Sequence, residues 1–318
     1  MVSGWWGQKH HCTFCGLNGE SISYRARSAE RTLELLHALA EHYPNTNRFQ
    51  AADNIMPTSY FHDLLPKLAS NLPRPDVEYF WTVKPNLRRT QIRQLSAARV
   101  LYLQPGIESL ADNILKQMRK GVTALRNVYF LRTCQEEGIT VYWNNLIRIP
   151  GEKVEDYDRM VDWLPWLRHL RPAYGGAPKA ECHRFSPYFT EKERWTTRLR
   201  PMPWYAEIFP PDTIDIAKVA YYYEAEWRDV LGGSAYDALL SESARWTAAW
   251  MESARVPQCV MTEGGECLRI CDSRTGVLEE HPIGHTAARV LRELDEPCSR
   301  SKLQEKLADL YRRAAFGS

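Results

Sequence analysis

The chain has 318 residues, of which 44% are hydrophobic and 25% charged, and its formal net charge is +2. This small charge gives no support for nucleic acid or an anionic membrane as a partner, and no apolar run approaches the ~20 residues that cross a bilayer. The length allows one full core or two domains. Eight cysteines are scattered along the chain with no signal peptide before them, which predicts a cytoplasmic protein whose reduced thiols bind metal or pack.

Strands and helices are predicted to alternate through the first half of the chain. After an opening loop, Ser28 can cap a helix whose leucines recur at helical spacing and which ends near Pro44. Further helices are predicted over residues 60–70, 88–98, 109–121, 124–138 and 153–170, and strands over 48–55, 77–83, 99–107, 139–149 and 179–188. Short links between them imply parallel strands joined by right-handed crossovers. Five strands are too few for a closed eight-stranded barrel and suit a partial one.

The pattern changes after residue 190. Residues 205–227 and 241–254 are predicted to be helices with no strands between them, so residues 191–255 form a helical connection. Residues 259–283 follow as a β-hairpin or meander with Gly-Gly and Thr-Gly turn signals. Two helices separated by Pro297, the second capped by Ser299, end the chain. Residues 256–318 are therefore predicted to be a small winged-helix-like domain.

Cys12 and Cys15 form a Cys-x-x-Cys pair in the opening loop. Such a pair can be half of a zinc site, a redox pair, or part of an iron–sulfur loop. A redox pair is disfavoured, because a glycine-rich loop follows where a helix would be needed. Zinc needs two more ligands, and the adjacent His10 and His11 rarely both reach one tetrahedral ion. The pair alone leaves zinc and iron–sulfur open.

Seven motifs along the chain point to one family. The opening loop reads WWGQKHHCTFCGLNG over residues 5–19, and ADNIM (52–56), VKPNLRR (83–89), QPGIESL (104–110), MRKG (118–121), IPGE (149–152) and RFSPYF (184–189) follow in order. On these residues the chain, up to about residue 225, resembles the radical SAM enzymes called RiPP maturation radical SAM protein 1, relatives of cobalamin-dependent peptide methyltransferases. The resemblance implies an α/β fold, a partial (β/α)6 TIM-like barrel over residues 1–190. The six later motifs lie at or just beyond strand ends, the edge that carries chemistry in such barrels.

The resemblance also implies a [4Fe–4S] cluster and S-adenosylmethionine (SAM) as cofactors. Cys12 and Cys15 are then two cluster ligands, and no catalytic residue is assigned. The SAM-binding residues that it implies are Phe14 near the adenine, Asp53 and Asn54 at the amino end, Glu108, Ser109 and Lys120 at the ribose and carboxylate, and Pro150, Gly151, Ser186 and Pro187 around the adenine. A structural role at a strand end or turn is the alternative for each residue.

Several features depart from the family pattern. Gly4 stands where the family has its third cluster cysteine, Arg148 where a small glycine is expected, and Thr82 where a glutamate is expected. The family's cobalamin-binding domain is absent from this chain, and only residues 1–3 remain of the first barrel strand. We therefore expect that domain to be lost or to lie on a separate polypeptide. We also expect an exposed sheet edge near residues 49–55, with the first twenty residues disordered in the apo chain.

The function predicted from the sequence is modification of a ribosomally made precursor peptide, by C-methylation through the cluster, SAM and cobalamin. The alternative is a catalytically inactive remnant that binds the precursor peptide through residues 256–318. This segment resembles winged-helix elements that bind leader peptides by strand addition. A DNA-binding winged helix is the rival, but Glu305 and Asp309 interrupt any basic stripe on its second helix. Cys267 and Cys271 share one strand face and are expected to pack.

Overall fold

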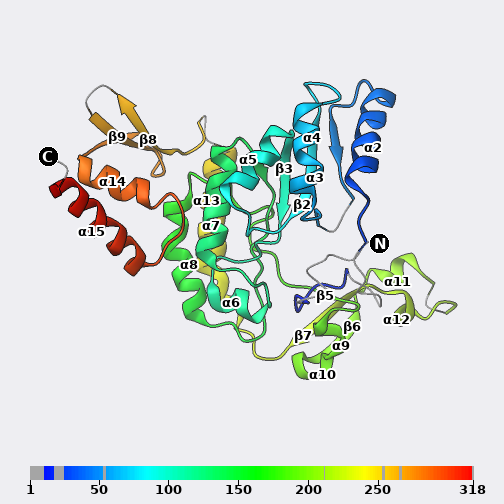
Figure 1. Cartoon of the computed structure of the whole chain (residues 1–318). Helices are drawn as coiled ribbons and strands as arrows, with labels where there is room; N and C mark the ends of the chain where they lie inside the picture. The colour runs from blue at the N-terminus through cyan, green and yellow to red at the C-terminus, as the bar shows by residue number, and fades with distance from the viewer. Residues whose placement is uncertain are drawn as a thin grey trace.

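The structure is a computed structural model that describes residues 11–17, 25–52, 55–210, 212–252, 255–264 and 267–316 (Figure 1). The expectations about Gly4, His10, Asp53 and Asn54, and about disorder of residues 1–10 and 18–20, lie outside this part of the chain. The expected disorder is wrong for residues 11–17, whose backbone is held by hydrogen bonds to Met118 and Tyr188. No helix within it combines the length and apolar composition needed to span a membrane.

A parallel sheet of four strands, in the order β1-β2-β3-β4, forms the centre of the fold. Its strands are β1 (Arg48–Gln50), β2 (Glu78–Val83), β3 (Val100–Pro105) and β4 (Thr140–Val141). Alternate residues of β2 are buried, as a pleated strand requires when one face meets the core. The expected parallel α/β sheet is confirmed, and β1 and β4 are its two edges among the described strands.

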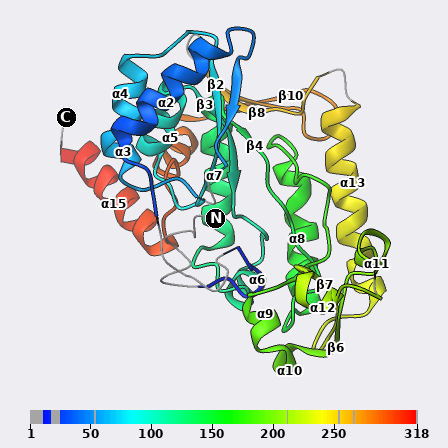
Figure 2. The same cartoon turned by 90° about the vertical axis from the view of Figure 1, so that its right-hand side faces the viewer.

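Helices connect and cover these strands. They are α2 (Ala29–His42), α3 (Tyr60–Asp63), α4 (Leu65–Ser70), α5 (Arg89–Ala97), α6 (Asp112–Gln117), α7 (Ala124–Glu136) and α8 (Val154–Leu167). The predicted cap is present, since the Ser28 side chain accepts a hydrogen bond from the Arg31 amide at the start of α2. Figure 2 shows α2 and α4 at one end of this layer and α8 toward the other.

The predicted fourth strand is regular only over β4. Beyond it, two isolated parallel bridges join Glu108 to Asn145 and Ile147 to Lys179. The backbone of Arg148 then turns with a φ of +64°, in the left-handed region that an extended strand cannot contain. This is the conformation that glycine adopts most easily, which agrees with the expectation of a small residue at this position.

The predicted fifth strand does not belong to the parallel sheet. After the bridge at Lys179, β5 (Cys182–His183) pairs antiparallel with β7 (Tyr222–Trp227), which pairs in turn with β6 (Thr196–Pro201). The prediction of a purely helical connection over residues 191–255 is therefore wrong for β6 and β7. Along β7 the exposed and less exposed side chains alternate, the period of a strand with one face packed.

Short helices surround the second sheet, namely α9 (Pro187–Thr190), α10 (Lys192–Trp195), α11 (Tyr205–Ile208) and α12 (Ile216–Val219). The single helix predicted over residues 205–227 is therefore wrong, because α11, α12 and β7 occupy that range. A 3-10 turn, η1 (Gly233–Tyr236), leads into α13 (Asp237–Met251), which packs beside α8 (Figure 2). The second sheet thus has its own small core, built from Cys182, Tyr188, Tyr205, Ala220 and Tyr223.

The C-terminal unit is an antiparallel meander followed by two helices, as predicted. Strands β8 (Cys259–Gly264), β9 (Cys267–Asp272) and β10 (Glu279–Ile283) precede α14 (His285–Glu293) and α15 (Arg300–Phe316). The expected cap is confirmed, because Ser299 Oγ accepts a hydrogen bond of 3.2 Å from the Lys302 amide. Cys271 is half-buried, with its sulfur 3.8 Å from Thr262 Oγ1, as expected for a packing residue. The winged-helix assignment stays a prediction.

Ion pairs attach this unit to the helices of the first layer (Figure 1). Asp295 lies 2.9 Å from the guanidinium of Arg89 and 3.2 Å from that of Arg132. Arg274, between β9 and β10, donates a hydrogen bond of 2.7 Å to the carbonyl of Trp166 in α8. The attachment is therefore largely polar.

Candidate functional site

The loop of residues 11–17 lies between the two sheets. The Thr13 amide donates to the carbonyl of Met118 after α6 (3.2 Å), and the Thr13 carbonyl accepts from the amide of Tyr188 in α9 (2.9 Å). Phe14 packs against both hydrophobic cores. The loop is thus held from both sides, although no strand in the described residues leads into it.

Cys12 and Cys15 lie at the two ends of one tight turn. The Cys15 amide donates to the Cys12 carbonyl over 3.2 Å, and both side chains are half-buried free thiols. Burial raises the pKa of the Cys15 thiol, and the positive charge of Lys120 opposes that rise. The two cysteines therefore share one turn, and the charge of Lys120 reduces but does not cancel the rise in the pKa of Cys15.

His11 is engaged by its own loop, because its Nε2 donates a hydrogen bond of 2.7 Å to the Cys15 carbonyl. Across the part of the chain that the structure describes, no group of three His, Cys, Asp or Glu side chains is placed to hold a metal ion. A metal ion bound at Cys12 and Cys15 would therefore need a further ligand from outside the described residues.

Glu108 and Lys120 form a buried ion pair beside this loop. The Lys120 ammonium is 3.6 Å from Glu108 Oε1 and 5.5 Å from the centre of the Phe14 ring. Although burial alone would lower the pKa of Lys120, Glu108, Cys12 and Cys15 raise it, so this side chain stays charged. The structure therefore brings together five of the predicted site residues, from the opening loop, the end of β3 and the turn after α6.

Gly106 makes room for this ion pair. A Cβ on Gly106 would lie 2.8 Å from the Lys120 ammonium, a distance at which one of them would have to move. The QPGIESL motif thus contributes the space for the pair as well as its carboxylate.

Lys84 is a site residue that the sequence analysis did not predict. It directly follows β2 and is buried, with 9% of its surface exposed. Its pKa is lowered to about 7, chiefly by burial; Cys12 opposes this shift and Lys120 adds to it. The signal was present in the VKPNLRR motif, where a lysine stands at the carboxyl end of a buried strand.

Replacing Lys84 with methionine is expected to stabilise the cluster-free chain most at or below pH 7. Below that pH Lys84 is protonated in both states, so the net cost of placing its ammonium in this site, as given by the lowered pKa, opposes folding. As the pH rises from about 7 toward 10.5, the folded protein carries the neutral amine while the unfolded chain is still protonated, and this cost disappears. Urea unfolding at about pH 6 and about pH 10 measures the difference. Lys116→Met, on the surface of α6, is the control, and an equal effect of Lys84→Met at both pH values would contradict the prediction.

Several other predicted residues have local structural roles. Ser109 Oγ accepts from the Ala111 amide (3.1 Å), and Ser186 Oγ accepts from the Phe189 amide (3.2 Å), with Pro187 in the first turn of α9. Ser186 and Pro187 therefore help to place Tyr188, which holds the cysteine loop. These contacts match the structural alternative considered for them.

Pro150 and Gly151 belong to a turn that carries a buried carboxylate, Glu152, which the sequence analysis did not predict. Gly151 has a φ of +85°, and its amide donates to the Asp229 carbonyl over 2.9 Å. Glu152 accepts hydrogen bonds from the amides of Ile149 (2.9 Å) and Leu231 (3.1 Å), and from the hydroxyls of Tyr157 and Tyr236. The IPGE motif thus joins α8 to the segment before α13.

Residues of the second sheet and its neighbouring turns pack closely against the cysteine loop. A Cβ on Gly16 would overlap the carbonyl oxygen of Arg184 and would lie 2.9 Å from both His183 Cβ and Tyr221 Oη. This close approach explains a glycine after the second cysteine. Burial, followed by the nearby Cys15, raises the pKa of Tyr221 to about 12, so its hydroxyl is protonated at neutral pH.

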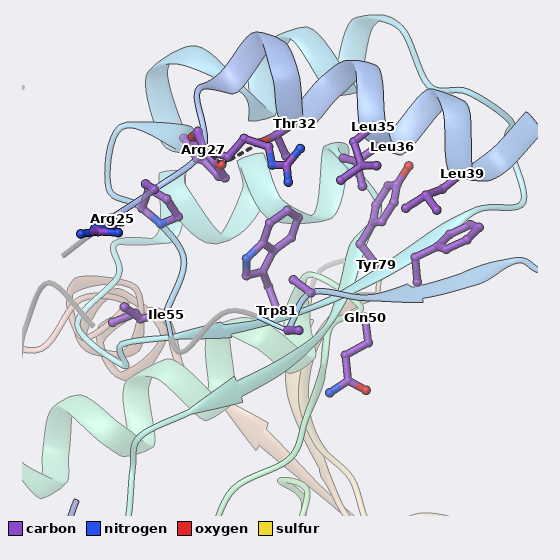
Figure 3. Close-up of a pocket in the computed structure, with 16 residues that line it drawn as sticks. Arg25, Arg27, Thr32, Leu35, Leu36, Leu39, Gln50, Ile55, Tyr79 and Trp81 are labelled. Carbon is purple, nitrogen blue, oxygen red and sulfur yellow. Dashed lines mark hydrogen bonds between the residues drawn. The ribbon is translucent and has the colours of Figure 1, made fainter. Parts of the chain in front are cut away.

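A cavity of about 420 Å³ lies elsewhere, between α2 and the strands β1 and β2 (Figure 3). Leucines of α2 face Tyr79 and Trp81 of β2 across it, and Arg25 and Arg27 lie at one end. Of the predicted site residues that the structure describes, none lines it. The candidate site is therefore placed at the cluster around the cysteines, where five of the predicted residues meet.

Residues 9–164 match the family model described as the radical SAM superfamily. Among solved structures, the fold is similar to that of OxsB, a cobalamin-dependent S-adenosylmethionine radical enzyme (15% identity, TM-score 0.53, 76% of this chain and 39% of that chain). It is also similar to TsrM, a radical S-adenosylmethionine methyltransferase from Kitasatospora setae (16% identity, TM-score 0.55, 74% of this chain and 50% of that chain).

These likenesses concern the fold alone. The chain spans half or less of the length of those two structures. No curated protein shows a significant sequence match.

Proposed function

We propose that this chain binds a [4Fe–4S] cluster at Cys12 and Cys15 and SAM beside it, and acts as a radical SAM enzyme. The match of residues 9–164 to the radical SAM superfamily model supports the proposal. When bound, such a cluster supplies the electron for reductive cleavage of the SAM sulfonium. The observation that carries the proposal is the turn that places both thiols against the buried Glu108–Lys120 pair.

The residues of the site fit the cluster in chemistry and space. The charge of Lys120 acts on both cysteines and would offset the negative charge of thiolates, and Gly16 and Gly106 leave room where a side chain would collide. Lys120 would hold an anionic group of SAM, and Phe14 would pack against an apolar part of it. The third cluster ligand would come from outside the described residues or from a partner chain.

We propose a ribosomally made precursor peptide as the substrate and its C-methylation as the reaction, with cobalamin carried by a separate polypeptide. The ordered motifs support this proposal. The C-terminal unit also suits a peptide partner, because β8 is an edge of its meander and carries no proline, whereas Pro282 lies in the other edge, β10. The proposed location is the cytoplasm, with neither nucleic acid nor membrane as a partner.

A second candidate is a catalytically inactive protein that binds the precursor peptide. It is favoured by one observation, namely that the described residues provide only two ligands for a metal ion. The two candidates differ in whether the chain takes up iron.

Anaerobic reconstitution with iron and sulfide tests the choice. The wild-type chain is expected to bind four irons and to show a [4Fe–4S] absorption spectrum, and Cys12→Ala or Cys15→Ala is expected to abolish it. Cys298→Ala, a half-buried thiol near the start of α15, is the matched control and should retain the cluster. With SAM and a reductant the loaded chain should release 5′-deoxyadenosine, and with a precursor peptide and the cobalamin protein it should add a methyl group.

Failure of the wild-type chain to take up iron, with or without neighbouring gene products, would overturn the enzyme proposal. Retained peptide binding in that case would support the second candidate. Loss of both would contradict each of them.

A further inference from the structure

We propose that Tyr221 is a positioning residue whose hydroxyl donates a hydrogen bond to a sulfur atom at the Cys12–Cys15 site when the cluster is bound. The inference rests on the proposed function, since it requires a cluster at these cysteines. It gives a residue beside the second sheet direct contact with the cluster that the cysteine loop would hold.

The backbone of Tyr221 is fixed on both sides of its side chain. Its amide donates to the hydroxyl of Tyr205 (2.8 Å), and its carbonyl accepts from the amide of Arg184 (2.7 Å). Its ring packs against that of His183, with centroids 5.3 Å apart. The hydroxyl is therefore held in one place instead of sampling many.

The hydroxyl of Tyr221 lies against the cysteine loop, residues 11–17. Tyr221 Oη lies 2.9 Å from the position of a Cβ on Gly16, the residue after Cys15. Figure 1 shows the loop, in dark blue, next to β5 and close to the start of β7. Cys15 is also close enough that, besides burial, the charge of its thiolate contributes to the raised pKa of Tyr221.

The hydroxyl oxygen of Tyr221 is buried, and it makes no hydrogen bond within the described part of the chain. A buried hydroxyl left unpaired costs free energy, so buried hydroxyls nearly always find an acceptor. A neutral thiol is a weak acceptor, whereas a thiolate or sulfide on iron is anionic and a much better one. The acceptor therefore becomes effective only when the cluster is present.

Two consequences distinguish this role from a packing role. A hydrogen bond to a cluster sulfur stabilises the more negative, reduced state and raises the reduction potential. It also slows loss of the cluster. Without the cluster the hydroxyl contributes nothing favourable, so its removal should leave the stability of the apo chain unchanged or slightly higher.

The test uses the full chain with Tyr221→Phe, which removes only the hydroxyl. Tyr222→Phe is the matched control, because Tyr222 is the next residue and more exposed, in β7. We expect the loaded Tyr221→Phe protein to have a lower reduction potential, measured by spectroelectrochemistry, and to lose iron to a chelator about tenfold faster. Tyr222→Phe should match the wild type in both.

Each remaining outcome counts against a specific claim. A loaded Tyr221→Phe protein with wild-type potential and wild-type iron loss overturns the inference and leaves the proposed function standing. An equal loss of thermal stability in the apo and loaded variants overturns it too, since the partner would then be a protein group. A wild-type chain that takes up no iron overturns the proposed function, and this inference with it.

Discussion

Replacing Glu152 with alanine is expected to lower the free energy of unfolding by about 3 kcal/mol or more. The buried carboxylate accepts from two backbone amides and two tyrosine hydroxyls, and these donors would lose their partner together. Each buried donor left without an acceptor costs roughly 1–3 kcal/mol. Urea denaturation, followed by circular dichroism, measures the change.

Two further variants sharpen this test. Glu152→Gln keeps one carbonyl oxygen and should fall between the wild type and alanine. Glu155→Ala, an exposed acid in the first turn of α8, should cost less than about 1 kcal/mol, the usual range for a helix-end charge. If Glu152→Ala were as mild as Glu155→Ala, the carboxylate would not be the link between α8 and the segment before α13.

Replacing Gly16 with alanine is expected to abolish cluster binding while the chain stays folded. The added methyl group would overlap the carbonyl of Arg184, a backbone atom that cannot move aside as a flexible side chain could. The loop would have to lift from the second sheet and carry Cys15 away from Cys12. Iron content and the cluster absorption after reconstitution measure the effect.

Gly233→Ala is the control for this substitution. A Cβ at Gly233 meets no other atom within 4 Å, and the variant should bind as much iron as the wild type. Circular dichroism would show whether each variant keeps its secondary structure. Full iron content in Gly16→Ala would show that the loop does not lie as close to Arg184 as the structure has it.

The parallel sheet and the C-terminal meander could be predicted because their signals are local. Strand and helix patterns alternate with short links, and turn residues separate β8, β9 and β10. The second sheet was missed because β5 and β7 lie far apart in the sequence, and pairing of that kind leaves no local mark. The alternation along Tyr222–Trp227 was present, but it lies within a stretch whose other residues favour helix.

The residues of the candidate site also fall into those that the sequence predicts and those that it does not. Cys12, Phe14, Cys15, Glu108 and Lys120 were predicted from motifs, and the structure brings them together. The roles of other residues depend on which segments meet in space, and a sequence motif does not show which segments will meet. Lys84, Glu152 and Tyr221 were not predicted for this reason.

The docking of the cysteine loop on both sheets has a consequence for the order of events during synthesis. The loop leaves the ribosome about 170 residues before Tyr188 and still earlier than Tyr221, the residues that receive it. Closing such a long loop is entropically costly until the second sheet exists to hold it. The two thiols therefore remain accessible in the nascent chain, open to iron delivery and to oxidation alike, until the second sheet has been made.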